Sequence, residues 1–317
     1  MQGRVFEATG SWYKIHTENN EIFNCRIKGN LRLDDINSTN PLVVGDYVNF
    51  EIETNNASQG IIHEILPRDN YICRRSPRNG RKIHILAANI DEVLLLVTLK
   101  QPRTSKGFID RFLLSAEMFH IPAVILVNKK DLYTKEDLVH FEELKTIYTP
   151  LGYRILLVSS FDAGDINKIK RLITGKTSMF VGHSGVGKSS MLNSLAPELN
   201  RPVNEISTYS GKGMHTTVHS LMFQVKLDGV VFDSFIIDTP GVKEWEPILL
   251  EPAEVGHYFP EIRTRMEHCR FNNCLHVAEP KCAVTNAVES EEIAESRYIS
   301  YLNILEGRQL INPWDDF

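Results

Sequence analysis

The sequence GHSGVGKSS at positions 182–190 follows a short apolar stretch, 178–181, and precedes a helical pattern. It satisfies the phosphate-loop pattern G-x-x-x-x-G-K-S in the strand, loop and helix order that the motif requires. Its glycines allow consecutive backbone N–H groups to converge on phosphate oxygens at the positive end of a helix. The stretch therefore predicts a nucleotide-binding α/β domain, with a glycine-rich turn that binds no ligand as the alternative.

Two side chains at the end of this loop carry chemistry of their own. Lys188 supplies a point charge for the terminal phosphates of a nucleotide, and the hydroxyl of Ser189 is placed to ligate Mg²⁺. We therefore expect the loop to hold a nucleotide together with magnesium.

The segments before the loop alternate between apolar strands and amphipathic helices. Strands are predicted over 90–99, 123–127 and 154–159, and helices over 106–119, 135–148 and 165–173. Nearly continuous apolar strands separated by helices are typical of a parallel sheet that is covered on both faces. Residues 86–245 are thus predicted to form one central α/β domain.

A guanine-reading motif is predicted where the second of these strands ends. The sequence NKKD, 128–131, lies there, at the carboxyl edge where sheets of this class bind ligands. The Asp131 carboxylate can accept hydrogen bonds from the ring N–H and the exocyclic amine of guanine, whereas adenine does not present this pair of donors. Backbone N–H groups at Ser159 and Ser160, after the third strand, can reach the guanine carbonyl oxygen, although this signal is weak by itself.

Further contacts to the nucleotide are predicted after the phosphate-loop helix. A polar stretch at 197–214 leads into HTT, 215–217, and a hairpin over 218–226 and 230–237 then ends in DTPG, 238–241. An acid at a strand end, here Asp238, can hold Mg²⁺ through water, and the N–H of Gly241 can sense a terminal phosphate. Together these parts predict a Mg²⁺-dependent guanine-nucleotide site.

The order of the motifs is unusual. In a standard small GTPase the phosphate loop comes first and the guanine motif near the end, whereas here NKKD precedes the phosphate loop, which precedes HTT and DTPG. The same site can survive such a rearrangement because the chain ends of these domains lie at the surface and often close together. We therefore expect a circularly permuted domain.

The N-terminal residues, 1–68, are predicted to form a five-stranded barrel of the oligonucleotide-binding (OB) type. Short strands are expected at 3–9, 12–17, 22–27, 48–53 and 60–66, separated by Gly, Asn and Asp. Its aromatic residues can stack on RNA bases, but such residues more often fill a barrel interior. A small barrel with a purely packing role is the alternative.

A loop-like basic connector is predicted between the barrel and the α/β domain, with the linker itself at 69–85. Its neighbourhood is rich in cations, which are Arg68, Arg74, Arg75, Arg78, Arg81 and Lys82 against the single acid Asp69. Clustered arginines beside a barrel suit contact with a phosphate backbone. A solvated linker is the alternative.

The C-terminal segment, 246–317, is predicted to be a zinc-binding loop followed by a helix. It contains four soft ligands in a short run, Cys269, Cys274, His276 and Cys282. Three thiolates and an imidazole suit a closed tetrahedral Zn²⁺ site, which supplies folding energy to a small segment. His257 and His268 are competing imidazoles, buried free thiols are the alternative, and a helix is expected over 291–306 with Ser290 as its N-cap.

Composition excludes several classes of protein. The chain has 317 residues, of which 42% are hydrophobic and 24% charged, as in ordinary globular proteins. Its longest apolar runs, such as 121–127, are far shorter than the roughly 18 to 20 residues of a membrane span. The N-terminus has no apolar signal region, so a cytoplasmic location is expected. The net charge of −5 argues against a nucleic-acid footprint over the whole surface but permits a local basic patch.

The motif order, the barrel and the Cys3His segment together resemble the circularly permuted ribosome-assembly GTPases of the RsgA family, also called YjeQ or YloQ. The resemblance covers essentially the whole chain. It implies an OB barrel, a permuted GTPase domain, a zinc domain, and the cofactors GTP or GDP, Mg²⁺ and one structural Zn²⁺. It also implies binding to the small ribosomal subunit and its rRNA late in maturation, hydrolysis stimulated by the subunit, and release.

The matched positions give the predicted sites. Nucleotide binding is assigned to Asn128, Lys129, Lys130, Asp131, Ser159, Ser160, Gly182, His183, Ser184, Gly185, Val186, Gly187, Lys188, Ser189 and Ser190. Catalysis is assigned to Lys188, His215, Thr217, Asp238 and Gly241, and magnesium to Ser189, Thr217 and Asp238. His215 is either the residue that orients water or a structural histidine, and Thr217 is preferred over Thr216 as the magnesium ligand.

Two other functions stay open at this point. A small-molecule or nucleoside kinase would also use the phosphate loop, but it needs neither NKKD nor DTPG. An RNA-binding protein with a vestigial nucleotide site would not need the intact Lys188, Ser189 and Asp238. We expect a monomer without membrane contact.

Overall fold

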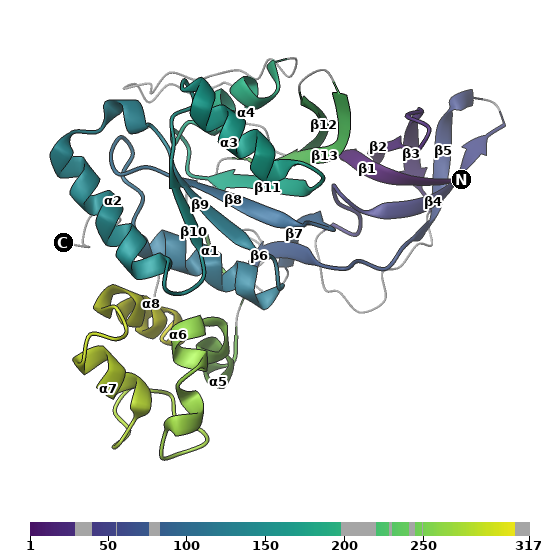
Figure 1. Cartoon of the computed structure of the whole chain (residues 1–317). Helices are drawn as coiled ribbons and strands as arrows, with labels where there is room; N and C mark the ends of the chain where they lie inside the picture. The colour runs from purple at the N-terminus through teal and green to yellow at the C-terminus, as the bar shows by residue number, and fades with distance from the viewer. Residues whose placement is uncertain are drawn as a thin grey trace, which may run out of the picture.

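The computed structural model describes residues 1–28, 40–54, 56–75, 83–197, 220–227, 230–240, 245–248 and 250–307, and all structural statements concern these residues. None of the helices within these ranges is long and apolar enough to cross a bilayer. Figure 1 shows a barrel around the N-terminus, a central α/β domain, and a group of helices below that domain.

The barrel is closed by five strands, as predicted. These are β1 (Gln2–Thr9), β2 (Trp12–His16), β3 (Ile22–Ile27), β4 (Tyr47–Glu53) and β5 (Asn56–Ile65). They follow the order β1-β2-β3-β5-β4, and β4 pairs back onto β1. Alternate side chains point inward, so Val5, Ile15, Phe23, Phe50 and Ile62 share one buried cluster. Trp12 and Tyr47 stay more than a third exposed and do not fill the interior.

The central domain contains a sheet whose order matches a permuted nucleotide-binding domain. Its strands are β8 (Glu92–Val97), β9 (Ala123–Val127), β10 (Arg154–Leu157), β11 (Thr177–Gly182), β12 (Leu221–Leu227) and β13 (Val230–Asp238). They lie in the order β10-β9-β8-β11-β13-β12, and only β12 runs antiparallel to its neighbour within this set. The strand that leads into the phosphate loop, β11, therefore lies near the centre of this sheet.

Helices cover both faces of this sheet, as the apolar strands predict. They are α1 (Lys106–Met118), α2 (Lys135–Tyr148), α3 (Ala163–Ile173) and α4 (Lys188–Leu195), with a short 3-10 helix η1 (Lys130–Leu132) before α2. Alternation along β8 sends Val93 and Leu95 into a cluster with α1 and α2, and Leu94 and Leu96 into a cluster with α3 and α4. Figure 1 shows α3 and α4 above the sheet and α1 below it.

The segment after the barrel is not the loop-like connector that the sequence suggested. Strands β6 (Tyr71–Arg75) and β7 (Ile83–Ala88) pair antiparallel and form a separate two-stranded sheet. The hairpin packs on α1 through Tyr71 and Phe119, whose ring centroids lie 4.8 Å apart. The loop-like interpretation is therefore wrong for these residues, because alternating apolar side chains flank the charged ones and give the hairpin a buried face.

The C-terminal part is more helical than a loop followed by one helix. It contains α5 (Pro252–Val255), η3 (Gly256–Tyr258), α6 (Pro260–Arg263), η4 (Met266–His268), α7 (Ala283–Glu289) and α8 (Glu295–Leu305). The helix expected from 291 with Ser290 as N-cap is corrected in two respects. Ser290 is the C-cap of α7, and Glu291 has a φ of +60°, which prevents it from continuing or starting a helix. The last helix begins only at Glu295.

The barrel and the central sheet are joined through their main chains. Strand β1 pairs with β12 where Glu7 faces Leu221, so eleven strands form one continuous sheet. Leu221 also pairs with Asp238 of β13. A single register position on β12 thus connects the barrel to the end of β13, where the predicted magnesium ligand lies.

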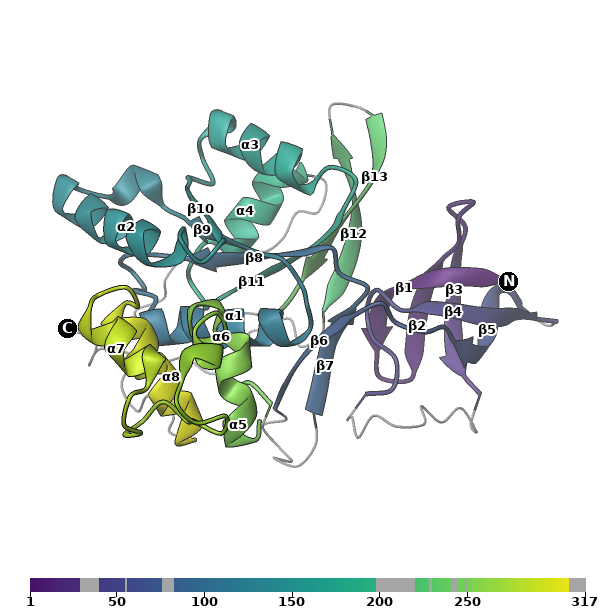
Figure 2. The ribbon, with the colours of Figure 1, turned by 60° about the horizontal axis from the view of Figure 1, so that its bottom comes forward.

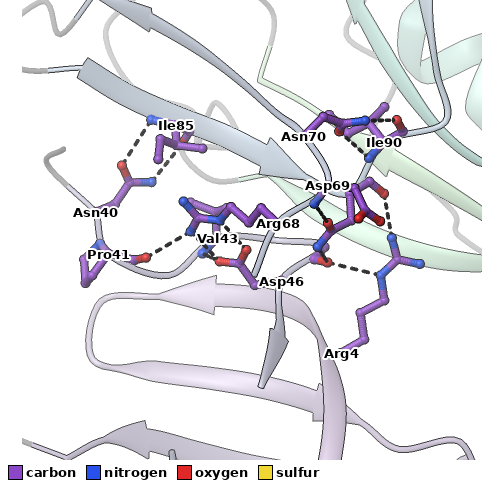
Figure 3. A network of polar contacts seen from close by, with 12 residues as sticks. Arg4, Asn40, Pro41, Val43, Asp46, Arg68, Asp69, Asn70, Ile85 and Ile90 are labelled. Carbon is purple, nitrogen blue, oxygen red and sulfur yellow. Dashed lines mark hydrogen bonds and ion pairs between the residues drawn. The ribbon is translucent and has the colours of Figure 1, made fainter. Parts of the chain in front are cut away.

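Side chains add a polar network at the same joint (Figure 3). Arg4 donates from Nε to the carbonyl of Gly45 (3.3 Å) and from Nη2 to the carbonyl of Asn89 (2.9 Å). Asn89 Nδ2 donates to the same Gly45 carbonyl at 3.0 Å. Arg68 holds Asp46 through two hydrogen bonds, Nε to Oδ1 at 2.6 Å and Nη2 to Oδ2 at 2.7 Å. These contacts set the position of the barrel loop beside β7 and β8.

The C-terminal helices are joined to α1 through buried charges. Arg297 of α8 donates from Nη1 to Asp110 of α1 at 2.7 Å and from Nε to Glu261 of α6 at 2.6 Å. Asp110 also accepts a hydrogen bond from the hydroxyl of Tyr148 at 2.8 Å. Leu114 of α1 belongs to the apolar cluster of the C-terminal helices. Figure 2 shows these helices gathered beneath α1.

Candidate functional site

The phosphate loop connects β11 to α4 at the carboxyl edge of the central sheet. Gly187 is the N-cap of α4 and offers no side chain, so the N–H groups at this helix end face outward for an anion. Its φ of +94° and the closeness of Asn128 Nδ2, 2.4 Å from where a Cβ would stand, both require glycine. Val186 is fully buried and anchors the loop. The backbone is therefore shaped for a phosphate group.

His183 connects this loop to helix α1. Its ring centroid lies 3.7 Å from that of Phe108, with the planes inclined by 34°. Phe108 is buried in the core between α1 and the sheet. The first side chain of the loop is thus held by a fixed partner, whereas Ser184, next along the loop, is exposed.

Asn128 joins the guanine-reading segment to the phosphate loop. It is buried and donates from Nδ2 to the carbonyl of Val186 at 2.9 Å. Its Oδ1 accepts a hydrogen bond from Ser160 Oγ at 3.2 Å. The side chain of Asn128 therefore fixes the three predicted nucleotide-binding segments relative to one another, and the second hydrogen of its amide nitrogen is not used in these contacts.

Asp131 and Ser159 meet at the same edge. Ser159 Oγ donates to Asp131 Oδ1 at 2.5 Å, which leaves Oδ2 of the carboxylate for a ligand. The residue before them in the motif, Lys129, has a left-handed backbone (φ +68°) and donates from Nζ to the carbonyl of Gln101. Burial lowers the pKa of Lys129, and the nearby Asp131 partly opposes this. Asp131 is thus held in place with one free acceptor oxygen.

Lys130 has a structural partner. Its Nζ donates to Asp165 Oδ2 at 2.7 Å, and this hydrogen bond raises the pKa of Lys130. The same carboxylate accepts from the backbone N–H of Ser159 at 3.2 Å. Desolvation would raise the pKa of Asp165, but hydrogen bonds from Lys130 and Lys168 outweigh it and lower the pKa. Lys130 therefore stabilises the loop that holds Ser159 and Ser160.

Lys188 and Asp238 lie in direct contact. Lys188 Nζ donates to Asp238 Oδ1 and to the backbone carbonyl of Thr239. Both charged side chains are about nine-tenths buried, at 11% and 8% exposure. The hydroxyl of Thr239 donates to the carbonyl of Phe180 in β11 at 2.8 Å and ties the end of β13 to the phosphate-loop strand. The cation predicted to bind phosphate and the carboxylate predicted to bind magnesium thus lie next to each other at the edge of the sheet.

Not every predicted residue can be placed. Ser189 and Ser190 lie in the first turn of α4 and are partly exposed. His215, Thr217 and Gly241 lie outside the described residues, as do the cations Arg78, Arg81 and Lys82. Their assigned roles stay predictions.

The four predicted zinc ligands come together. The ligand atoms of Cys269, Cys274, His276 and Cys282 all lie within 4.8 Å of one another. His276 Nδ1 faces the thiols, at 3.5 Å from Cys269 Sγ and 3.3 Å from Cys282 Sγ, and the two sulfurs are 3.9 Å apart. A tetrahedral zinc ion with bonds of about 2.0–2.3 Å needs ligand atoms roughly 3.3–3.8 Å apart. The donor set fits Zn²⁺, and the three distances among Cys269, His276 and Cys282 are close to this range. The competing residue His268 is exposed and pairs with Glu267.

Aromatic hydroxyls support the loop that carries His276. Tyr298 donates to the carbonyl of His276 at 2.6 Å, and Tyr301 donates to the carbonyl of Leu275 at 2.8 Å. Both tyrosines belong to α8, the helix that also carries Arg297. The metal-binding cluster is thus attached to the same helix that contacts α1.

Some supporting residues were not predicted from the sequence. Asp165 holds both Lys130 and Ser159, and Tyr133 donates to the carbonyl of Asn128 while accepting from the N–H of Leu99 at 3.0 Å. The sequence does offer a signal for Asp165. It lies three residues after Asp162, the N-cap of helix α3, and this helix follows the third strand. No local pattern distinguishes Tyr133 from other tyrosines.

Comparisons with known proteins agree with this geometry. The family model described as RsgA GTPase matches residues 65–247, and the model described as RsgA N-terminal domain matches residues 2–62. A relative from Bacteroides fragilis, named small ribosomal subunit biogenesis GTPase RsgA, is 47% identical over 98% of this chain and 97% of that protein. A relative of the same name from Flavobacterium johnsoniae is 46% identical over 97% of this chain and 93% of that protein.

Solved structures show the same arrangement. The crystal structure of YjeQ from Thermotoga maritima has 33% identity and a TM-score of 0.72 over 96% of this chain and 97% of that one. The structure of YloQ, described as a circularly permuted GTPase, has 27% identity and a TM-score of 0.70 over 96% and 94% of the two chains. On its motifs, its permuted sheet and these matches, the chain belongs to the RsgA family of circularly permuted GTPases, enzymes that hydrolyse GTP.

Proposed function

We propose that this chain is a Mg²⁺-dependent GTPase that binds the small ribosomal subunit and its rRNA during late maturation. The subunit stimulates hydrolysis, and hydrolysis is coupled to release. The observation that carries the proposal is the convergence of the guanine-reading residues, the phosphate loop and Asp238 at one sheet edge, next to a strand that pairs with the barrel. The names of the relatives supply the subunit.

The base is read by the carboxylate of Asp131. Ser159 holds Oδ1, which keeps a second lone pair, and the carboxylate accepts from the ring N–H and the exocyclic amine of guanine. An adenine base would leave this carboxylate without its pair of donors, so GTP is preferred over ATP. Asn128 contributes by holding the loops together.

The phosphates are bound by backbone N–H groups of the loop and by Lys188. The oxygen ligands of Ser189, Asp238 and Thr217 suit Mg²⁺, a hard cation that keeps several waters, and when bound this ion neutralises charge that develops on the phosphates. When a nucleotide binds, Lys188 leaves its ion pair with Asp238 and contacts a phosphate instead. The pair keeps both groups at the point where they act.

Hydrolysis by the free protein is expected to be slow. The residue after DTPG is Val242, and an aliphatic side chain can neither orient nor polarise water. His215, next to the threonines of HTT, is the remaining candidate for this role. A partner that positions this segment would then raise the rate.

RNA contact is assigned to the barrel and to the basic hairpin. Trp12 and Tyr47 are exposed on barrel strands, and aromatic rings of this kind stack on bases. Arg74 and Arg75 lie at the end of β6, beside the sequence that holds the remaining cations. Because the whole chain carries a net charge of −5, binding must use such a local patch and will weaken as salt rises.

The bound zinc is assigned a structural role, since four protein ligands leave no open position for chemistry. Cys274→Ser is expected to lower the zinc content and loosen the C-terminal helices while preserving much of the nucleotide affinity. Full zinc content in this variant would point to a replacement ligand.

The function is tested by measuring GTP hydrolysis with and without purified small and large ribosomal subunits at fixed salt. We expect acceleration by the small subunit alone, and tighter subunit binding with a non-hydrolysable GTP analogue than with GDP. Equal rates with either subunit, or equal affinity in both nucleotide states, would contradict the proposal. Hydrolysis of ATP as fast as GTP would instead favour a kinase-like or general phosphate-loop activity.

A further inference from the structure

Phe161 is an exposed aromatic residue beside the base site. With 82% of its surface exposed, it is the most exposed of the large hydrophobic residues within the described part of the chain. It follows directly after Ser159 and Ser160, in the loop that leads from β10 to α3. An exposed apolar side chain is common in itself and requires no function. Its connection to the base site is the feature that needs an explanation.

The backbone of Phe161 is held by the same hydroxyl that holds Asp131. The N–H of Phe161 donates to Ser159 Oγ at 3.2 Å, and this Oγ donates to Asp131 Oδ1 at 2.5 Å. One oxygen atom therefore connects the exposed aromatic residue to the carboxylate that reads guanine. The backbone that carries the ring is therefore fixed next to the base site.

The residues on either side keep this loop in place. Asp162 caps α3 by accepting from the N–H of Asp165 at 2.9 Å, and Asp165 accepts from the N–H of Ser159. Ser194 of α4 donates to the carbonyl of Ser160 at 2.7 Å. The loop is thus tied at several points to α3 and α4 while the Phe161 ring extends from it into solvent.

We propose that the ring of Phe161 stacks on one face of the guanine base whose edge Asp131 reads. This inference rests on the proposed base site. A purine has two flat faces, and an aromatic side chain that covers one removes apolar surface of both rings from water. The exposed ring then gains a partner that no protein residue supplies within the described structure. Phe161 acts as a binding residue and takes no part in the hydrolysis step.

Stacking and edge recognition have different signatures. A stacking ring interacts with the face of any purine, so its loss weakens GDP, IDP and XDP by the same factor. The carboxylate of Asp131 interacts only with the edge, so Asp131→Asn changes the ratio of GDP to XDP affinity. The two contributions are therefore separable in one set of binding measurements.

The test is isothermal calorimetry of the full chain with Mg²⁺ and each diphosphate, comparing Phe161→Ala, Phe161→Trp and Asp131→Asn with the parent. We expect Phe161→Ala to bind all three nucleotides about 5- to 150-fold more weakly, which corresponds to about 1–3 kcal/mol per stacked base. Phe161→Trp should retain the affinity, and saturating GDP should quench its tryptophan fluorescence more than that of the parent, which has three tryptophans elsewhere. Phe271→Ala is the matched control, since this exposed phenylalanine lies in the C-terminal part.

Each outcome decides between alternatives. GDP affinity within about twofold of the parent in Phe161→Ala would overturn the proposal, and weakened small-subunit binding in that variant would then assign the ring to the subunit. An equal loss for all nucleotides together with an unchanged GDP to XDP ratio in Asp131→Asn would retain stacking and remove Asp131 from the base site. Thermal unfolding of Phe161→Ala should match the parent, because the ring is exposed.

Discussion

The central domain is joined to its two neighbours by different physical means. On the barrel side, a buried arginine, Arg4, donates to neutral backbone carbonyls, and a β-strand pairing adds main-chain contact. On the C-terminal side, a buried arginine, Arg297, lies between the carboxylates of Asp110 and Glu261. The two arginines are almost equally inaccessible, at 8% and 2% exposure. Each joint thus contains one buried arginine, but Arg4 is bound to neutral carbonyls and Arg297 is bound to carboxylates.

The difference predicts how each joint responds to damage. A backbone carbonyl that loses one hydrogen-bond donor stays uncharged, and the Gly45 carbonyl also keeps its second donor, Asn89. The loss of folding stability is therefore modest. A carboxylate that loses its cation in a buried site keeps an uncompensated charge, and this is among the largest single-residue effects. The C-terminal joint should therefore depend strongly on Arg297, whereas the barrel joint should depend little on Arg4.

The largest effect is expected for Arg297→Met. Methionine preserves most of the volume but leaves Asp110 and Glu261 buried without their cation, and breaking such a group costs about 3–5 kcal/mol. Urea unfolding of the full chain should lose this amount, and limited proteolysis should cleave the C-terminal helices first.

The control for Arg297→Met is Arg263→Ala, which removes the ion pair between Arg263 and Glu117 at the same joint. These side chains are 49% and 24% exposed and lie 3.3 Å apart. An exposed pair contributes only about 0–1 kcal/mol. If the two variants lost similar amounts of unfolding free energy, burial of charge would not determine the strength of this joint.

The sequence predicted the parts of the fold that depend on local patterns. The phosphate loop, the NKKD segment, the barrel and the Cys3His cluster all follow from spacing or alternation within short windows. The hairpin β6–β7 was missed because its cations concealed an alternating buried face, and α7 was missed because the ligand spacing drew attention to a loop. A site can therefore be predicted from the sequence when all the residues that form it lie close together in the chain.

The joints were not predictable for the opposite reason. Arg297 and Asp110 are 187 positions apart, and Arg4 and Asn89 are 85 apart. No window of the sequence contains both members of either pair, and many other charged residues offer equivalent partners. The same holds for Asp165 and Lys130, whose contact depends on how two loops meet at one sheet edge.

The next largest effect is expected for Arg68→Met at the barrel joint. This change removes the cation that pairs with buried Asp46, so the cost should approach about 3 kcal/mol, the lower end of the range for buried pairs. Asp46 keeps the hydrogen bond from the N–H of Val43 at 2.8 Å, which limits the loss. Thermal unfolding of the full chain measures it, with Arg26→Ala, at an exposed pair with Glu53, as the control.

The loss in Arg68→Met should also depend on pH. Desolvation already raises the pKa of Asp46 in the parent, with Arg68 opposing it, and removing Arg68 raises the pKa further. A folded-state pKa above the unfolded value means that protonation favours the folded state, so the penalty is full above the folded pKa and shrinks as pH falls through it. A penalty that stayed constant from neutral pH towards pH 4 would contradict this account.

A smaller effect is expected where α1 contacts the segment after β13. Trp245 is fully buried and donates from Nε1 to Ser115 Oγ at 2.8 Å. Ser115→Ala leaves this N–H without its partner, which costs about 1–3 kcal/mol for a neutral group. Urea unfolding gives the loss, and a changed near-UV signal from the tryptophan shows whether the ring moves. An unchanged stability would mean that water or another group replaces the serine.

The smallest effect is expected for Arg4→Met, the direct counterpart of Arg297→Met. The Gly45 carbonyl keeps its hydrogen bond from Asn89 Nδ2, and the change removes a cation whose pKa burial lowers. Two hydrogen bonds and cation–π contacts with Tyr47 at 4.9 Å and Phe235 at 5.3 Å are lost, but relief from desolvation offsets part of this. We expect a net loss of about 1 kcal/mol in urea unfolding. A loss as large as that of Arg297→Met would show that burial of the arginine itself, and not the charge of its partners, determines the strength of each joint.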